Sequence, residues 1–135
     1  MIKLFIGGKG SGKTKTLIEL VNNATAASNG SVVCIEKGDK LTHDITYKAR
    51  LIDSDDYSIT TADTLYGFIA GVLASNSDIT DVFVDSALKI CDNDIVAFDK
   101  LVAELAGLVE KLGVNVVMTS SLPVEEASET VKKYI

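Results

Sequence analysis

A glycine-rich loop close to the first residue narrows the architectures open to this chain more than any other segment. An apolar run of strand length, residues 2–6, precedes it, and apolar side chains follow at helical spacing, at Leu17, Leu20, Val21 and Ala24. The loop fits the phosphate-binding pattern Gly-x-x-x-x-Gly-Lys-[Ser/Thr], with Gly7, Gly8, Lys9, Gly10, Ser11, Gly12, Lys13 and Thr14. A strand, a glycine-rich turn and a helix N-terminus in this order predict a nucleotide-binding βα unit. Residues 7–14 are called the glycine-rich loop below.

Each residue type in the glycine-rich loop has a chemical role in binding phosphate. Glycines adopt backbone angles closed to other residues and let backbone N–H groups approach an anion. The helix N-terminus adds unpaired N–H groups and a partial positive charge. We expect Lys13 to place a full charge at the β- and γ-phosphates and Thr14 to place a hydroxyl on Mg²⁺. The competing interpretation of residues 7–14 is an ordinary glycine-rich turn between a strand and a helix. Lys9 is expected to be a solvated lysine of the loop.

Composition and charge limit the classes of protein to which the chain can belong. The sequence is 47% hydrophobic and 24% charged with one proline, so we expect a single domain spanning residues 1–135. The net charge of −6 does not indicate a nucleic-acid surface, although it leaves a local basic patch open. No uncharged apolar stretch reaches the roughly 18 residues of a membrane span. Cys34 and Cys91, without a signal peptide, predict a reduced, cytoplasmic setting.

Apolar strands alternate with helical segments along the chain. The expected strands are residues 2–6, 31–35, 81–85 and 114–118, with a short edge strand at 57–60. The expected helices are residues 12–27, a segment opening at 60–63, residues 94–112, and a last helix from Pro123 to Ile135. Residues 41–51 suit either a short helix or a hairpin. Continuously apolar strands separated by helices predict an α/β three-layer sandwich, with a mostly parallel sheet of about five strands and helices on both faces.

Polar residues follow three of the expected strands, at the edge where parallel sheets bind ligands. They are Glu36 after residues 31–35, Asp85 at the end of residues 81–85, and the run 119–121 after residues 114–118. An acid at a strand end is the usual partner of a phosphate-binding loop, because it holds Mg²⁺ beside the loop threonine. We therefore expect Thr14 and Asp85 to be the metal-side residues. The alternative role for Asp85 is to cap a turn.

These features make the chain resemble the RecA-like P-loop ATPases over most of its length. The resemblance rests on the glycine-rich loop, on the order of strands and helices, and on Asp81-Val82-Phe83-Val84-Asp85-Ser86-Ala87-Leu88. It implies that residues 114–118 form a strand between the loop strand and the Asp85 strand. It also implies Mg²⁺-dependent ATP hydrolysis, with Lys13 and a water-activating glutamate as catalytic residues. Glu36 is the expected glutamate, Asp39 is its alternative, and the sensor position falls on Ser120 or Ser121.

Two other function classes stay open on the sequence. Ser86 stands where many related ATPases have a second acid, which leaves room for a regulatory module that changes shape or partner on binding ATP without hydrolysing it. A small nucleoside or nucleotide kinase is the other alternative. Arg50 is the only arginine, and the cysteine lasso of thymidine kinases is missing. The chain lacks an Asn/Thr-Lys-x-Asp guanine motif, which favours ATP over GTP.

The partners suggested by the sequence are a nucleotide and a second protein chain. RecA-like assemblies often send a basic residue into a neighbouring subunit's site. Arg50 is the candidate for that role, and it would act only in an oligomer. A homo-oligomer and an unidentified protein partner are both open.

Overall fold

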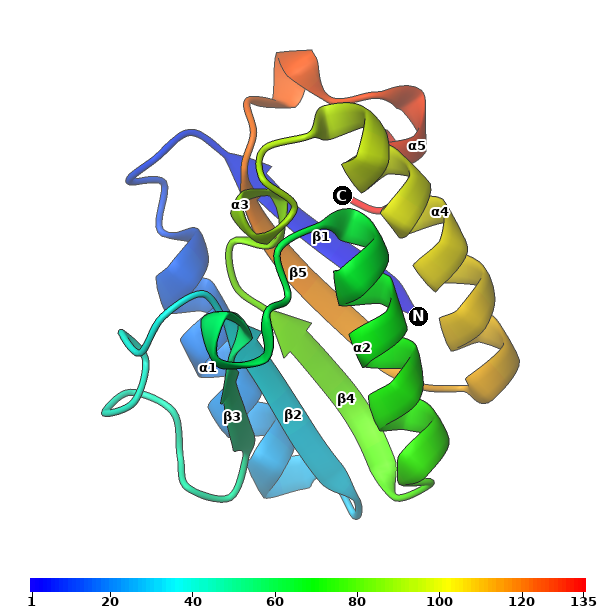
Figure 1. Cartoon of the computed structure of the whole chain (residues 1–135). Coiled ribbons are helices and arrows are strands. Elements are labelled where there is room, and N and C mark those ends of the chain that lie inside the picture. Colours follow the sequence, from blue (N-terminus) through cyan, green and yellow to red (C-terminus); the bar gives the residue numbers. More distant parts are fainter.

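The computed structural model describes residues 1–135 and contains one five-stranded, all-parallel sheet. The strands are β1 (Ile2–Gly7), β2 (Ser31–Glu36), β3 (Arg50–Asp53), β4 (Ile79–Val84) and β5 (Asn115–Ser121). Their order across the sheet is β1-β5-β4-β2-β3 (Figure 1). The strand at residues 114–118 was expected between the loop strand and the Asp85 strand. The position of β5 between β1 and β4 confirms this.

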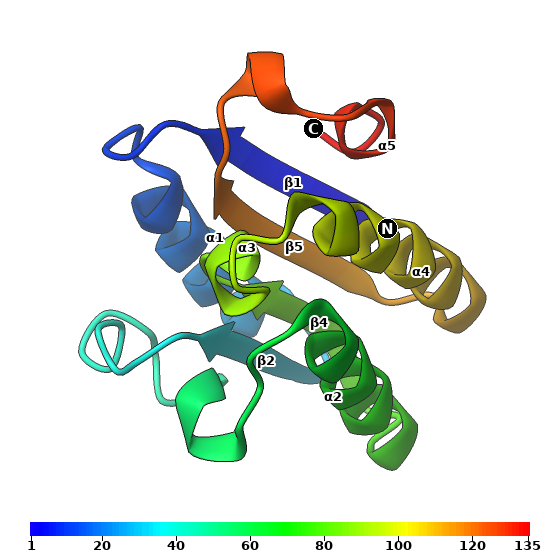
Figure 2. The same ribbon diagram turned by 45° about the horizontal axis from the view of Figure 1, so that its top comes forward.

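Helices cover both faces of the sheet, as the alternating pattern predicts. They are α1 (Lys13–Ala27), α2 (Ala62–Ser75), α3 (Ala87–Ile90), α4 (Ile95–Leu112) and α5 (Glu129–Lys132). Helix α1 lies behind the sheet, and α2, α3 and α4 lie in front of it (Figures 1 and 2). Each face has its own apolar core, and on the α1 side it is built around the fully buried Leu17 and Val21. Burying one such side chain stabilises the fold by about 1.5–3 kcal/mol.

The sheet register brings the polar strand ends together at one edge. Ile6 pairs with Ser120 and Gly7 with Ser121, so the glycine-rich loop leaves β1 beside the end of β5. On the other side of β5, Val84 pairs with Met118, so Asp85 follows directly beside Thr119. The loop, the end of β5 and Asp85 therefore meet at the carboxyl ends of three neighbouring strands.

The long helix α4 has the ends that the sequence indicates. The Asp94 side chain accepts a hydrogen bond from the Ala97 N–H at its start. Gly113 ends it in the left-handed region at φ 68°, and its N–H bonds the Val109 carbonyl. A glycine at this position avoids the strain that a Cβ would introduce. The observed bounds are within one residue of the expected 94–112.

The expected edge strand at residues 57–60 is wrong. The edge strand β3 lies at Arg50–Asp53 and pairs parallel with β2, while residues 54–57 form a 3₁₀ turn. Asp53 ends the strand, because its carboxylate accepts from the N–H groups of Gly38 and Asp55. Residues 41–49, before β3, form neither a helix nor a hairpin strand. They run as turns that bury Leu41, Ile45 and Ala49 in the core on the α1 side.

The single helix expected from Pro123 to Ile135 is also wrong. The segment forms a 3₁₀ turn (Val124–Glu126) and the short α5, separated by Ala127 in an extended conformation. The Tyr134 carbonyl then accepts a hydrogen bond from the Leu4 N–H at 2.7 Å, so the chain end lies along the outer edge of β1. This hydrogen bond and the extended Ala127 hold the last residues against β1 and not in a continuous helix.

Cys34 and Cys91 are both free and buried, and burial raises the pKa of each thiol to about 12. Such thiols stay protonated at neutral pH and are poor nucleophiles. No helix combines the length with the apolar character that a membrane crossing requires.

Candidate functional site

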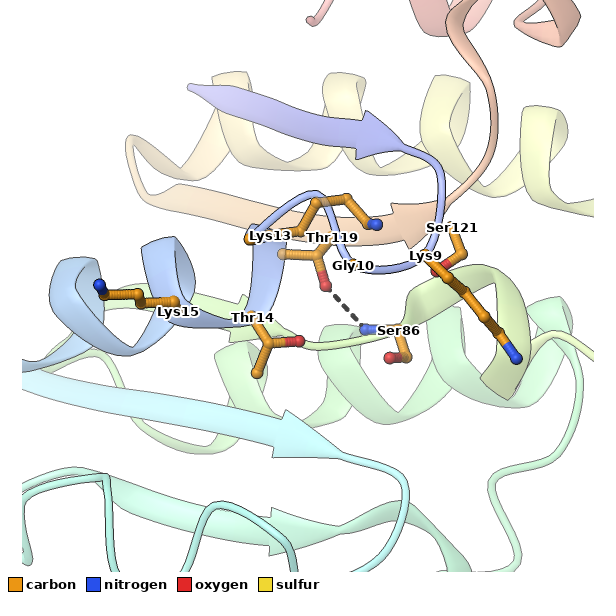
Figure 3. A pocket seen from close by; sticks show the side chains of 9 residues that line it. Lys9, Gly10, Lys13, Thr14, Lys15, Ser86, Thr119 and Ser121 are labelled. Atoms are coloured by element: carbon orange, nitrogen blue, oxygen red, sulfur yellow. Dashed lines mark hydrogen bonds between the residues drawn. The ribbon is translucent and has the colours of Figure 1, made fainter.

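A polar cavity of about 410 Å³ opens at the sheet edge where the glycine-rich loop, the end of β5 and the start of α3 meet. None of its nine lining residues is hydrophobic, and five of them belong to the loop. The lining residues are Lys9, Gly10, Gly12, Lys13, Thr14, Lys15, Ser86, Thr119 and Ser121 (Figure 3). Of the eight residues expected to bind nucleotide, Gly7, Gly8 and Ser11 shape the loop without lining the cavity.

Two of the glycines that line the cavity set the backbone conformation of the loop there. Gly10 and Gly12 both lie in the left-handed region, at φ 79° and 85°. A Cβ at either position would meet no atom within 4 Å, so the backbone conformation, and not crowding, is what calls for glycine. Gly12 is also the N-cap of α1, and no side chain caps that helix. The first N–H groups of α1 are therefore left free of side-chain partners at a helix end that attracts anions.

Lys13 is held over the loop in which it is expected to meet phosphate. Its ammonium donates hydrogen bonds to the Gly8 carbonyl at 2.8 Å and to Ser11 Oγ at 3.2 Å. Figure 3 shows the side chain folded back above the loop, whereas Lys9 extends from the loop over α3. Both partners of Lys13 are loop atoms, so its charge stays at the cavity wall and can bind an anion there.

Asp85 lies against the first turn of α1. Thr14 Oγ1 donates to Asp85 Oδ1 at 3.1 Å, and Thr119 Oγ1 donates to the same oxygen at 2.8 Å. Ser86 Oγ adds a longer contact to Oδ2 at 3.3 Å. The Asp85 residue is only 9% exposed, so its charge is directed at these hydroxyls and not at bulk water. A carboxylate and a hydroxyl in contact form a set of oxygen ligands of the kind that Mg²⁺ prefers.

The end of β5 fixes the position of Asp85. Thr119, 2% exposed, accepts a hydrogen bond from the Ser86 N–H at 2.9 Å while donating to Asp85 (Figure 3). Ser120 Oγ accepts from the Leu88 N–H at 3.1 Å and so anchors α3. Of the two expected sensor positions, Ser121 lines the cavity and Ser120 does not. The bridging contacts of Thr119 could not be read from the sequence, where the only signal is a polar triplet ending an apolar strand.

Glu36, the expected general base, lies outside this cavity. It is 2% exposed, and its carboxylate accepts from the Leu41 N–H with both oxygens, at 3.1 and 3.3 Å. It lines a separate cavity of about 460 Å³, together with Asp39 and Asp53. Burial raises the pKa of Glu36, the charges of Asp85 and Asp53 add to this, and the backbone N–H groups of Lys40 and Leu41 oppose it. Neither Glu36 nor Asp39 is among the residues that line the loop cavity.

Comparisons with known proteins add no family to this description. No protein-family model matches the chain, and a search of curated proteins finds no match either.

Proposed function

We propose that this chain binds ATP with Mg²⁺ at the glycine-rich loop and acts as a Mg²⁺-dependent, RecA-like P-loop ATPase. The observation that carries the proposal is the hydrogen bond between Thr14 and Asp85. It joins the first turn after a phosphate-binding sequence to an acid at the end of a neighbouring parallel strand. An ordinary glycine-rich turn has no reason to place such an acid against its threonine.

The residues of the loop cavity account for the binding of a triphosphate. Backbone N–H groups of the loop and of the α1 N-terminus surround the phosphates, and the Lys13 ammonium adds a full charge. Thr14 lines the cavity and Asp85 lies directly behind it, in contact with the Thr14 hydroxyl, so the two would fit a magnesium ion by chemistry as oxygen ligands. When bound, the ion neutralises charge that develops on the β- and γ-phosphate oxygens. Thr119 donates to the same Asp85 oxygen as Thr14 and so holds the carboxylate beside the Thr14 hydroxyl.

Hydrolysis further requires a base for the attacking water, and Glu36 is the residue proposed for it. Its raised pKa brings the carboxyl closer to the range in which a side chain exchanges protons near neutral pH. To act, Glu36 has to leave the Leu41 N–H, because both of its oxygens are engaged there. The proposed base is therefore coupled to the position of the segment after β2.

The same contact favours a second candidate function, an ATP-dependent switch without hydrolysis. The Leu41 N–H donates to the Glu36 carboxylate and so connects the segment after β2 to the end of that strand. In a switch, nucleotide binding changes this contact and ATP is not hydrolysed. Phosphate release by the wild type separates the two. In an ATPase, Glu36→Gln lowers release at least about tenfold, or about 1.4 kcal/mol in transition-state stabilisation, while ATP still binds. A wild type that binds ATP and releases no phosphate supports the switch.

Calorimetric titration of Mg·ATP into the wild type, Lys13→Ala and Lys48→Ala tests the binding itself. Lys48 is exposed and lies outside the loop cavity, so it serves as the matched control. A charge-assisted contact to phosphate contributes about 1.5–3 kcal/mol, so Lys13→Ala should weaken ATP binding by about 10- to 150-fold. Equal dissociation constants in all three proteins would refute the proposal.

A further inference from the structure

A second polar cavity, of about 320 Å³, adjoins the loop cavity. The two share Lys9, Ser86 and Ser121 in their linings. Lys40 and Lys89 line only the second cavity, as does Asn93. In Figure 3, Lys9 points away from Lys13, past Ser86 and toward the side of α3. A group bound in the second cavity would therefore lie next to whatever the glycine-rich loop holds.

Three lysines from distant parts of the sequence meet at this cavity. Lys9 belongs to the glycine-rich loop, Lys40 to the segment after β2, and Lys89 to α3. No acid is among the lining residues, and none of the three lysines forms an ion pair within 4.0 Å. The chain as a whole has a net charge of −6, so a cavity lined by three lysines and no acid differs in sign from the protein's overall charge. Like charges gathered around one cavity repel one another and attract an anion.

The three lysine side chains are exposed, and the backbone on the α3 side of the cavity is fixed by the fold. The N–H groups of Ser86 and Leu88 bond the hydroxyls of Thr119 and Ser120, which hold α3 against the end of β5. Leu88 is buried, so the backbone that carries Lys89 has a defined position. The Asn93 N–H bonds the Leu88 carbonyl at 2.9 Å, which closes the turn on which Asn93 lines the cavity. Lys89 and Asn93 are therefore carried by a rigid part of the fold, and rigid elements bind a ligand with less loss of entropy than mobile ones.

We propose that this cavity binds the phosphate group of a second small molecule, next to the nucleotide. Ammonium, hydroxyl and amide groups are the donors that phosphate oxygens accept from. The volume is at the lower end of the range for small-ligand pockets, so the ligand is a phosphorylated small molecule. The inference rests on the proposed function, because the second ligand is defined by its place beside a bound triphosphate.

The test uses inorganic phosphate as the probe and a non-hydrolysable ATP analogue with Mg²⁺ to fill the glycine-rich loop. The analogue is titrated first, and phosphate is then titrated into the saturated protein by calorimetry. Because the analogue already carries a γ-phosphate, any phosphate that binds afterwards lies outside the loop. The variants are Lys40→Gln and Lys89→Gln, with Lys48→Gln as an exposed control lysine that lines neither cavity.

The wild type and Lys48→Gln should bind phosphate saturably, and Lys40→Gln and Lys89→Gln should each lose at least about tenfold in phosphate affinity. All four proteins should bind the analogue within about twofold of one another. Absence of saturable phosphate binding to the saturated wild type, or equal phosphate affinity in all variants, would overturn the second site. Failure of the analogue to bind the wild type would instead overturn the proposed function, so the two failures are distinguishable.

Discussion

Thr119→Val removes one hydroxyl from the centre of the candidate site and keeps the shape of the side chain. It deletes the 2.8 Å hydrogen bond to Asp85 and leaves the Ser86 N–H without its partner. A hydrogen bond to a charged group contributes about 1.5–3 kcal/mol, and an unsatisfied N–H costs about 1–3 kcal/mol. Asp85 keeps Thr14 and Ser86 Oγ as donors, so we expect a net loss of about 2–4 kcal/mol in the free energy of unfolding.

Urea unfolding followed by circular dichroism measures this loss in unfolding free energy. In a thermal melt the same loss should lower Tm by on the order of 10 °C. Thr130→Val, on α5, is the control because the Thr130 side chain makes no hydrogen bond. It should change stability by less than about 0.5 kcal/mol. If Thr119→Val is as mild as Thr130→Val, Thr119 does not fix Asp85 in the way argued above.

Three further predictions concern the glycines, the base and the nucleotide. Gly12→Ala should destabilise the fold by about 1–2 kcal/mol in urea unfolding, because the residue sits at φ 85°; an unchanged midpoint would contradict this. The raised pKa of Glu36 means that the wild type should be most stable relative to Glu36→Gln below about pH 4, where the carboxyl is neutral in both states, and should lose that stability as the pH rises through the folded-state pKa; a constant difference in unfolding free energy contradicts it. ATP should bind more tightly than GTP in calorimetry, but by no more than about tenfold, because no apolar residue lines the loop cavity to hold a base; a much larger preference would point to a base pocket outside it.

The parts of the site that the sequence predicts are those fixed by strand ends. Parallel strands separated by helices align their carboxyl ends, so a polar residue directly after an apolar run can be placed at the ligand edge. This is why the glycine-rich loop and Asp85 could be expected to meet before any coordinates were known. The position of β5 between β1 and β4 came instead from the RecA-like resemblance, which puts residues 114–118 between the loop strand and the Asp85 strand.

What the sequence does not predict depends on contacts between segments without periodicity. β3 has only four residues, too few to show the alternation of apolar and polar residues that indicates a strand. The acidic residues that follow it give no signal of where the strand ends. The hydrogen bonds from Leu41 to Glu36 depend on a turn segment that has no regular structure. The lysines of the second cavity come from three segments, and only the fold brings Lys9, Lys40 and Lys89 together. Isolated lysines in a sequence are far more often solvated than gathered at a cavity.

The central claim is that the glycine-rich loop and Asp85 form one Mg·ATP site. Its most direct test compares the Mg²⁺ dependence of ATP affinity in the wild type and in Asp85→Asn. The substitution keeps the shape of the side chain and removes the charge that faces Thr14. We expect Mg²⁺ to raise ATP affinity in the wild type, and we expect the ratio of affinities with and without Mg²⁺ to fall at least about tenfold in Asp85→Asn. ATP should still bind the variant without the ion. The same ratio in both proteins would contradict the claim and leave Asp85 as a structural acid.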